Sequence, residues 1–400
     1  MAQNGTSLPN SKLPVLIIGA GVSGLALAQG LRRHNIPFRL FERHPKSHTS
    51  QGHRFRISQD GVDALNSILS EQLKDLLVRT RSEKTIWSPR YVDSQKFEFP
   101  PCAENPPPYS TPVDRAWIRY LLTLGIEDAI EYEKAFASYE VHDDEVRVLF
   151  SDASSVSGSL LVGADGLKSR VRKQLQPNRR LLDLERQITW GRTPLTPELR
   201  EQLPEDVLKD VLTWFMAIDK EANVQAIFDP MIWPESVHQV SDGRLPDFAD
   251  YIYFAIATAP VKDAPKSTEE KHSFLNNVAE KWHPRLRSLL DSASHDRSAC
   301  VPVLSSKPDI ELSSKPETPV TLIGDAAHAM SPMGGAGGDT AIRNAVDLAF
   351  TISRGFDSKH LREFEGRMAV LAKEKIEHSY RGGQKFWGGK EWYEYKETDA

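Results

Sequence analysis

The chain has 400 residues, with 50 lysines and arginines, 55 aspartates and glutamates, and a formal net charge of −5. The basic residues are scattered along the chain, which argues against a nucleic-acid-binding surface or a polybasic membrane patch. The two cysteines, Cys102 and Cys300, are too few for a disulfide framework and lack metal-ligand spacing, as is typical of a reducing compartment.

The N-terminal leader, residues 1–12, contains one late lysine and no apolar core, so we do not expect a signal peptide. No stretch of the sequence is long and apolar enough to span a bilayer. The sequence therefore predicts a cytoplasmic protein without a membrane span. Its length predicts two sequential or interleaved domains.

The most informative motif opens the chain after the leader. Residues 15–18 form an unbroken aliphatic run, as a strand buried on both faces requires. Gly19, Gly21 and Gly24 then fit the tight turn, the close backbone approach to a pyrophosphate, and the close packing of a helix on a strand. The helix expected from about Ser23 directs its free N–H groups at that pyrophosphate.

An acidic residue follows at the spacing that completes a dinucleotide fingerprint. Glu42 ends the second predicted strand, residues 38–41, where a carboxylate accepts a hydrogen bond from a ribose 2′-hydroxyl. Its charge repels a 2′-phosphate, so this site suits FAD or NAD better than NADP. The sequence predicts binding of an adenine dinucleotide.

The elements expected next alternate between short strands and helices. In chain order they are an edge strand over 51–57, a helix over 61–77, a proline-rich loop over 98–112, a helix over 114–124 capped by Asp114, a hairpin over 136–150 and a buried strand over 160–164.

The composition changes at about Pro177. Short alternating runs between 177 and 303 predict a mostly antiparallel sheet. A buried strand over 320–323 and an amphipathic helix over 340–354 follow, and Gly355 ends that helix. We expect a last helix over 364–377 and then a charged, aromatic tail.

Two further motifs place an acid at the end of a buried strand. Asp165-Gly166 follows the strand over 160–164, and Gly324-Asp325 follows the strand over 320–323. A glycine-dense loop, residues 334–338, then leads into a helix. Open α/β sheets bind ligands at the carboxyl ends of their strands, and a helix N-terminus stabilises negative charge there.

These three segments resemble those of the single-component (class A) FAD-dependent monooxygenases with the para-hydroxybenzoate hydroxylase fold. Residues 163–172 match the family's G-A-D-G-x-x-S-x-V-R segment, and residues 324–337 match its G-D-A-A-H-x-x-x-P-x-x-G-x-G segment. The resemblance covers residues 13–348. It implies an α/β fold, with a Rossmann-like FAD-binding domain, an inserted substrate domain built on a mostly antiparallel sheet, and C-terminal helices.

The resemblance also implies domain boundaries. The FAD-binding domain takes residues 1–80, 113–176 and 304–355, the substrate domain takes 81–112 and 177–303, and a C-terminal helical segment takes 356–400.

Residue roles come from the same resemblance. Glu42 is expected to hold the adenosine ribose, Arg115 the FAD phosphate and ribityl region, and Asp325 the ribityl chain. Backbone N–H groups at Gly337 and Gly338 are expected to face the N1–C2=O edge of the flavin, which carries the negative charge of the reduced ring. The other residues expected to contact the cofactor are Gly19, Gly21, Gly24, Arg43, Arg56, Asp165 and Gly335.

Other residues carry open interpretations. Arg192 is the candidate catalytic residue, since some family members place an arginine over flavin and substrate there, although a surface arginine on a sheet edge fits equally. His53, Arg54 and Arg56 favour packing or phosphate contact over catalysis. His328 fits a hydrogen-bonding residue behind the motif. The sequence departs from the family at Asp339, usually Asn, and at Asn344, often Asp.

The reaction implied is insertion of one oxygen atom from O2 into an aromatic or other apolar small molecule, in secondary metabolism or catabolism. NADPH or NADH reduces the FAD, and the reduced flavin captures O2 as a C4a-hydroperoxide in a water-poor cavity. The nicotinamide cofactor visits the same cleft, because the sequence has no second Rossmann motif.

Several alternatives stay open. An FAD-dependent reductase or dehydrogenase shares the fold, and a non-catalytic dinucleotide-fold binding protein is the rival from another class. A flavin-dependent halogenase is disfavoured because the sequence lacks its Trp-x-Trp-x-Ile-Pro motif. The substrate, the choice among hydroxylation, epoxidation and Baeyer–Villiger oxidation, the choice of NADPH or NADH, and monomer or dimer remain undetermined. No metal, nucleic-acid or membrane partner is expected.

Overall fold

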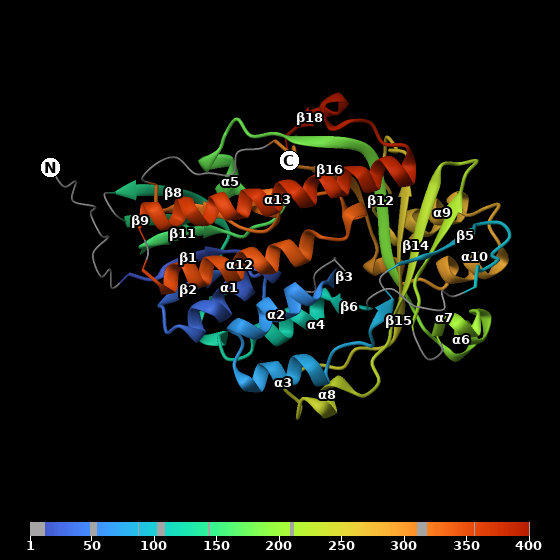
Figure 1. Ribbon diagram of the computed structural model, residues 1–400, viewed down its shortest axis with the longest axis horizontal. Coiled ribbons are helices and arrows are strands. Elements are labelled where there is room, and N and C mark those ends of the chain that lie inside the picture. Colours follow the sequence, from blue (N-terminus) through green and yellow to red (C-terminus); the bar gives the residue numbers. More distant parts are fainter. Residues whose placement is uncertain are drawn as a thin grey trace.

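The structure is a computed structural model that describes residues 13–48, 54–86, 88–101, 109–142, 145–208, 212–309, 318–355 and 357–399. The leader, His53 and Cys102 lie outside the described residues. Two large sheets organise the fold, one parallel and one mostly antiparallel (Figure 1).

The parallel sheet has five strands in the order β17-β11-β1-β2-β7. Their bounds are β1 (Val15–Ile18), β2 (Phe38–Phe41), β7 (Ile130–Glu131), β11 (Leu160–Gly163) and β17 (Val320–Leu322). Every pairing between them is parallel, and β1 and β11 are buried throughout. Because all five strands run in the same direction, their carboxyl ends lie at one edge of the sheet. The predicted Rossmann-like fold is confirmed.

Helices and a small antiparallel sheet surround this sheet. The helices are α1 (Val22–Arg33), α2 (Gln59–Ile68), α3 (Glu71–Arg79), α4 (Arg115–Thr123), α5 (Arg170–Leu175), α11 (Asp325–His328), α12 (Gly337–Ser353) and α13 (Ser358–Trp387). Helix α12 packs against α1, α2 and α13, and Figure 1 shows α12 and α13 running side by side. The small sheet contains β8 (Phe136–His142), β9 (Glu145–Phe150) and β10 (Ser155–Gly158).

The second large sheet has the strand order β16-β12-β15-β14-β13-β5, with β18 paired to β12. Its bounds are β5 (Arg90–Asp93), β12 (Leu181–Pro194), β13 (Phe215–Asp219), β14 (Val224–Met231), β15 (Tyr251–Thr258), β16 (Ala299–Ser305) and β18 (Lys396–Thr398). All pairings are antiparallel except that of β5 with β13. This confirms the mostly antiparallel sheet expected from residue 177 onward.

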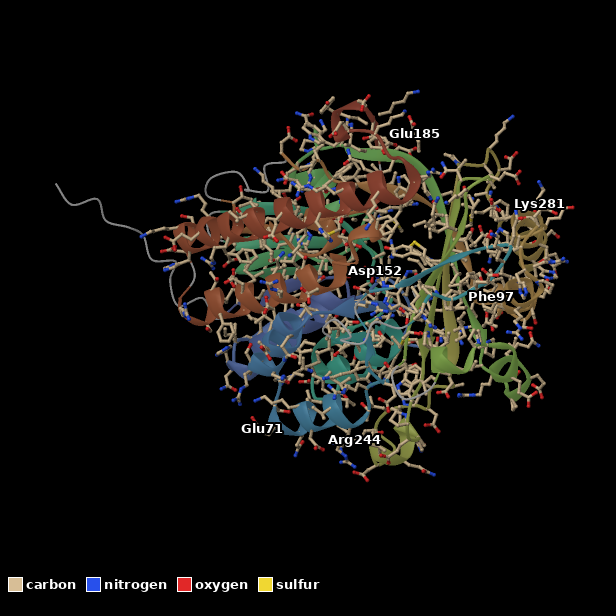
Figure 2. All side chains as sticks on the ribbon, turned by 45° about the vertical axis from the view of Figure 1, so that its right-hand side comes forward. Glu71, Phe97, Asp152, Glu185, Arg244 and Lys281 are labelled. Atoms are coloured by element: carbon tan, nitrogen blue, oxygen red, sulfur yellow. The ribbon has the colours of Figure 1, made fainter. Side chains whose placement is uncertain are left out.

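One side of the second sheet carries its own apolar core. Helices α6 (Pro197–Gln202), α7 (Glu205–Leu208), α9 (Thr268–Val278) and α10 (Pro284–Asp291) lie on this side, whereas the short α8 (Val237–Val240) lies near α3 (Figure 1). Phe97, labelled in Figure 2, belongs to this core together with Phe215 and Leu275. The opposite side faces the parallel sheet across β3 (Arg54–Ile57), β4 (Thr85–Ile86) and β6 (Tyr109–Asp114).

Three predicted elements differ from the structure. The helix predicted over 61–77 is divided into α2 and α3, because the Ser70 hydroxyl accepts a hydrogen bond from the Leu73 N–H (3.3 Å) and starts a new helix. The last helix runs from Ser358 to Trp387, well beyond the predicted 364–377. Residues 109–112, expected in a loop, belong to β6.

The remaining expectations that the structure describes agree with it. Helix α4 follows Asp114, whose carboxylate caps it, and β8 and β9 pair as the predicted hairpin. No described helix combines the length and the apolar character that a bilayer crossing needs.

Candidate active site

The glycine loop between β1 and α1 is shaped by two very close backbone approaches. Gly19 has φ +107°, and a Cβ there would lie 2.5 Å from the Ala164 carbonyl oxygen. A Cβ on Gly24 would lie 2.0 Å from the Gly19 carbonyl oxygen. Gly21 differs, since its Cβ would meet only the Ala164 oxygen, at 4.0 Å. Gly19 and Gly24 are therefore required by the fold itself, and Gly21 is not.

The carboxylate of Glu42 lies beside this loop. It is 8% exposed, and its two oxygens accept hydrogen bonds from the N–H groups of Ala20 and His44, each at 3.0 Å. The neighbouring Arg43 is exposed, and its Nε donates to the His44 ring (3.1 Å). Glu42 is thus fixed at the edge of the glycine loop, whereas Arg43 points along its own loop.

Asp165 caps a helix in this structure. Its carboxylate accepts hydrogen bonds from the Ser169 hydroxyl and from the N–H groups of Arg170 (2.8 Å) and Val171 (3.3 Å). These contacts hold the turn between β11 and α5 in place.

Asp325 begins the short helix α11 and is exposed to solvent. The carbonyl oxygens of α11 accept hydrogen bonds from two arginines, the buried Arg172 and the partly buried Arg179. Arg172 donates to the Asp325 and Ala326 oxygens (3.4 and 3.3 Å), and Arg179 donates to the Ala327 oxygen. Burial lowers the pKa of Arg179 to about 9. These two arginines position Asp325, and sequence reasoning gave neither of them a role.

Three helices share a feature that the other helices lack. No side chain caps α1, α11 or α12, whose N-cap residues are Gly21, Gly324 and Ala336. Every other α-helix whose first turn the structure describes with its side chains has a capping side chain. Free N–H groups at a helix start leave a site that accepts an anion.

The three uncapped helix starts lie close together. A Cβ on Gly324 would lie 2.6 Å from the Ser23 hydroxyl oxygen of α1 and 3.6 Å from the Ala341 Cβ of α12. The starts of α11 and α1 are therefore in contact at the carboxyl edge of the parallel sheet, and α12 passes beside them at Ala341, about one turn from its own start. A diphosphate and a negatively charged ring edge both fit such a region.

A phenyl ring covers the start of α12. A Cβ on Gly338 would lie 2.2 Å from the nearest atom of the Phe55 ring, so no side chain other than hydrogen fits there. The Arg115 guanidinium lies 5.6 Å from the centre of the same ring. Phe55, which sequence reasoning did not single out, joins β3 to two of the expected cofactor residues.

Arg192 and Asp114 connect the two halves of the molecule. The Arg192 Nη2 lies 3.3 Å from the Asp114 carboxylate, and the Arg192 guanidinium lies 4.3 Å from the centre of the Tyr251 ring. The Tyr251 hydroxyl donates to the same carboxylate oxygen (2.7 Å). Arg192 is therefore not a solvent-facing arginine on a sheet edge.

Arg56 is buried on β3, and both of its terminal nitrogens donate hydrogen bonds within the protein. It donates to the side chains of Thr85, Ser110 and Asp229 and to the Ile86 carbonyl oxygen. The structure therefore places Arg56 between β3 and the second sheet, apart from the glycine loop.

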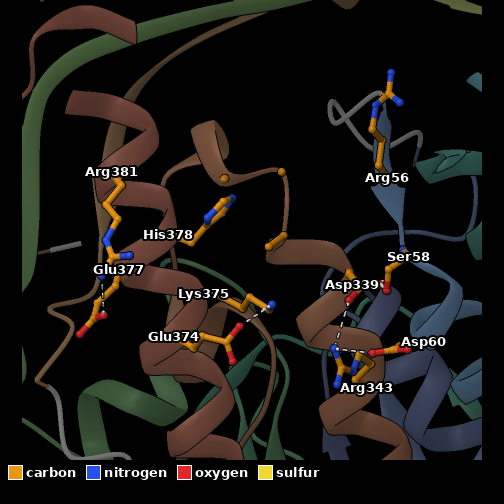
Figure 3. Close-up of a pocket in the computed structure, with 13 residues that line it drawn as sticks. Arg56, Ser58, Asp60, Asp339, Arg343, Glu374, Lys375, Glu377, His378 and Arg381 are labelled. Atoms are coloured by element: carbon orange, nitrogen blue, oxygen red, sulfur yellow. Dashed lines mark hydrogen bonds and ion pairs between the residues drawn. The ribbon is translucent and has the colours of Figure 1, made fainter. Parts of the chain in front are cut away.

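A groove of about 530 Å³ opens beside the start of α12 (Figure 3). Its walls come from the Gly334–Ala336 loop, the first turns of α2 and α12, and one side of α13, and Arg56 lines it on β3. Asp339 lies in this wall, and its carboxylate accepts hydrogen bonds from the N–H and hydroxyl of Ser58, both at 2.9 Å. The aspartate that departs from the family pattern thus joins α12 to α2.

His328 lies buried behind Asp325, and its Nε2 lies 2.7 Å from the Asn344 side-chain nitrogen. Burial lowers the pKa of His328 to about 4 from its usual 6.5. Between pH 6.5 and pH 4 the unfolded chain therefore binds one proton at His328 that the folded protein does not. The free energy of unfolding is unaffected by His328 above pH 6.5 and falls as the pH decreases towards 4.

We expect His328→Gln to remove that pH dependence. At pH 4 the loss from His328 amounts to about 3 kcal/mol of unfolding free energy, at about 1.4 kcal/mol per pH unit. Urea unfolding from pH 7.5 to pH 4 measures it, and the variant should lose less stability on acidification. Parallel curves for the two proteins would contradict this assignment.

Comparison with known proteins places the chain among flavoproteins. Two family profiles match, an NAD(P)-binding Rossmann-like domain over residues 17–63 and an FAD binding domain over residues 315–356. The chain is 31% identical, over 94% of its length, to a dual O-methyltransferase/FAD-dependent monooxygenase of Cercospora beticola, and covers 46% of that protein. It therefore spans less than half the length of this relative.

Two other relatives match over most of both chains. An FAD-dependent monooxygenase of Emericella nidulans is 28% identical, with 85% of this chain and 86% of that protein covered. A solved structure from Photorhabdus luminescens, described as an FAD-containing monooxygenase, has a TM-score of 0.79 at 25% identity and covers 94% of this chain and 99% of its own.

Proposed function

The chain belongs to the FAD-dependent monooxygenases with the aromatic-hydroxylase fold, and we propose that it uses NAD(P)H and O2 to hydroxylate or epoxidise an aromatic or other apolar small molecule. The observation that carries this proposal is the proximity of the three uncapped helix starts of α1, α11 and α12, with Glu42 beside the first. This arrangement suits one extended molecule with a ribose, a diphosphate and an anionic ring edge.

The residues present fit FAD. Gly21 leaves open space in front of the free N–H groups of α1, where the diphosphate would bind. Glu42 would accept from the adenosine ribose, Asp325 from the ribityl chain, and Arg115 would contact the phosphate region. When bound, FAD supplies the redox chemistry that activates O2.

The protein's own task is to bind, orient and exclude water. The N–H groups at Gly337 and Gly338 would lie against the ring edge that becomes negative on reduction, where a helix start contributes about 0.3–1 kcal/mol. Arg192 would orient the substrate from β12, with Asp114 and Tyr251 holding its guanidinium. Packing of the second sheet against the FAD-binding half would keep water away from the reacting atoms.

NAD(P)H would dock transiently in the same cleft. The five-stranded sheet is the only large parallel sheet among the described residues, so the structure offers no second Rossmann unit for it there. We propose a small-molecule substrate, a role in secondary metabolism and a cytoplasmic location, and leave the choice between NADPH and NADH and the oligomeric state open.

The test begins with the purified protein. It should show flavin absorbance, either as isolated or after addition of FAD. A library of aromatic compounds is then screened for substrate-stimulated oxidation of NADPH and NADH, with oxygen uptake and peroxide release measured in parallel. Oxygen uptake matched by oxygenated product supports a monooxygenase. Oxidation of NADPH or NADH without oxygen uptake indicates a reductase. Failure to bind FAD overturns the proposal.

Asp339→Asn is expected to raise the midpoint potential of the bound flavin by about 10–20 mV. The carboxylate lies in the first turn of α12, so its removal favours the negative charge of the reduced flavin by about 0.5–1 kcal/mol. The matched control is Asp60→Asn, because Asp60 pairs with the same Arg343 (3.5 Å) from solvent. A spectroscopic titration should show no shift in the control, and an equal shift in both would contradict the prediction.

A further inference from the structure

A buried cluster of two arginines and one aspartate lies between β3 and the second sheet. The side chains of Arg54, Arg56 and Asp229 are 5%, 9% and 0% exposed. Both guanidinium groups form ion pairs with the same carboxylate oxygen, Oδ2 of Asp229. Among the described residues, no other carboxylate pairs with either arginine.

The polar atoms of this cluster are incompletely satisfied. The Nε of Arg54 and the Oδ1 of Asp229 have no hydrogen-bond partner among the described residues. One carboxylate balances one guanidinium, so one buried positive charge is left over. Buried charges are costly unless they are paired, which makes this excess unusual for a purely structural cluster. Burial lowers the pKa of both arginines, that of Arg54 to about 10, and the charge of Arg54 lowers that of Arg56 further.

The second sheet presents aromatic and charged side chains to the cluster. Tyr253 on β15 pairs in register with Asp229 on one side and with Arg192 on the other. The Arg54 guanidinium lies 5.2 Å from the Tyr253 ring centre, and the Arg56 guanidinium lies 4.7 Å from that of Trp214. An aromatic molecule placed against this side of the sheet would meet rings as well as cations.

One member of the cluster also lines the groove beside α12. Arg56 lines that groove at its β3 wall. Figure 3 shows its side chain pointing away from Asp339 and Arg343, and its guanidinium contacts Asp229. Arg56 therefore connects the groove with the buried cluster.

We propose that Arg54, Arg56 and Asp229 form the anchoring site for an ionised acidic group, a carboxylate or phenolate, of an aromatic substrate. This inference rests on the proposed function and names its substrate class. The bound anion supplies the missing negative charge, and the Arg54 Nε–H, which has no partner among the described residues, donates to one of its oxygens. Arg54 and Arg56 bind the acidic group of the substrate and take no part in the chemical step. Arg54 is therefore a residue that determines substrate specificity.

The test compares two probes of nearly equal shape on the FAD-loaded protein. These are 2-naphthoate, which is charged, and 2-naphthamide, which is not, and binding is followed by the change in flavin absorbance. The unchanged protein should bind the acid at least about tenfold more tightly than the amide. Arg54→Met should bring the two affinities to within about twofold. This variant should fold, because Arg56 still pairs with Asp229.

Asp229→Asn should change the preference for the acid over the amide in the opposite direction. Removing the competing carboxylate should strengthen the preference for the acid by about threefold or more, a change that damage to the fold would not produce. Arg54→Lys, which keeps the charge, should retain a preference for the acid. Arg200→Met is the control, since Arg200 pairs with Asp250 near the protein surface and should leave the ratio unchanged.

The outcomes separate this inference from the proposed function, because binding is measured without NAD(P)H. Equal affinity for acid and amide in the unchanged protein, or an unaltered ratio in Arg54→Met, overturns the anion site and leaves oxygenation untouched. Failure of 2-naphthoate and the smaller benzoate to bind at about 10 mM also overturns it. If Arg54→Met shifts the flavin midpoint potential and leaves the ratio unaltered, the charge serves the reduced flavin, and the inference is wrong.

Discussion

Replacing Gly21 by alanine is expected to leave the apoprotein folded and to weaken FAD binding about a hundredfold, or by about 2.7 kcal/mol. The backbone at Gly21 has φ −76° and ψ −179°, which alanine adopts without strain. The added methyl group would meet no protein atom closer than 4.0 Å, but it would occupy the space in front of the α1 N–H groups. Melting of the apoprotein and a fluorescence titration with FAD measure the two effects separately.

Gly24→Ala is the matched comparison and should fail in a different way. Its methyl group would lie 2.0 Å from the Gly19 carbonyl oxygen, so α1 would have to move away from β1. We expect a loss of several kcal/mol of stability and a much lower yield of folded protein, with FAD binding lost as a consequence. Unaltered FAD affinity in Gly21→Ala would place the diphosphate elsewhere and would remove the main support for the cofactor site.

Asp114→Ala is expected to lower the unfolding free energy by about 3–5 kcal/mol. This side chain is fully buried and accepts hydrogen bonds from four partners in both halves of the molecule. One oxygen accepts from the N–H groups of Ala116 (2.7 Å) and Trp117 (3.1 Å), and the other accepts from Tyr251 and Arg192. Alanine removes the cap of α4 and leaves a guanidinium without this carboxylate.

Asp114→Asn should cost less, about 1–2 kcal/mol, because the amide oxygen can still cap the helix while the charge is lost. Unfolding of both FAD-loaded variants in guanidinium chloride measures these two losses of stability. If the asparagine variant is as unstable as the alanine variant, the ion pair with Arg192 dominates over the cap. If both variants are as stable as the unchanged protein, the Asp114 contacts between the two sheets do not contribute to the free energy of unfolding.

Local patterns predicted the parallel sheet and the segments that surround its carboxyl edge. An unbroken aliphatic run makes β1 recognisable, and the three glycines after it indicate a tight turn and the start of α1. The same local rules misplaced the end of α13. Gly382 and Gly383 lie inside this helix although glycine favours termination, because a Cβ on Gly382 would meet the Met333 backbone and one on Gly383 the Trp387 ring. Tertiary packing decided that boundary.

The candidate site was predictable only where its residues are close in sequence. The glycine loop and Glu42 lie within one motif, and their roles towards FAD stay predictions. Asp229 stands 173 residues after Arg56, on a strand with no motif of its own, so nothing in the sequence pairs them. The Phe55 ring against Gly338 was equally hidden, since only the packing of β3 against α12 reveals it. The alternation of Arg54 and Arg56 on one side of a strand was the available clue.

The length of α13 has a mechanical consequence. Its 30 residues extend for about 45 Å. At one end the Trp387 carbonyl oxygen accepts a hydrogen bond from Arg186 on β12 (2.9 Å), and further back Ser379 and Gly382 pack against the Met333–Gly334 turn. The helix is thus a stiff rod attached to both the antiparallel sheet and the turn before α12. Both contacts lie within residues 379–387, about 12 Å along the helix axis. A tilt of that sheet would therefore move the turn before α12, which would couple substrate binding at the sheet to the position of the flavin.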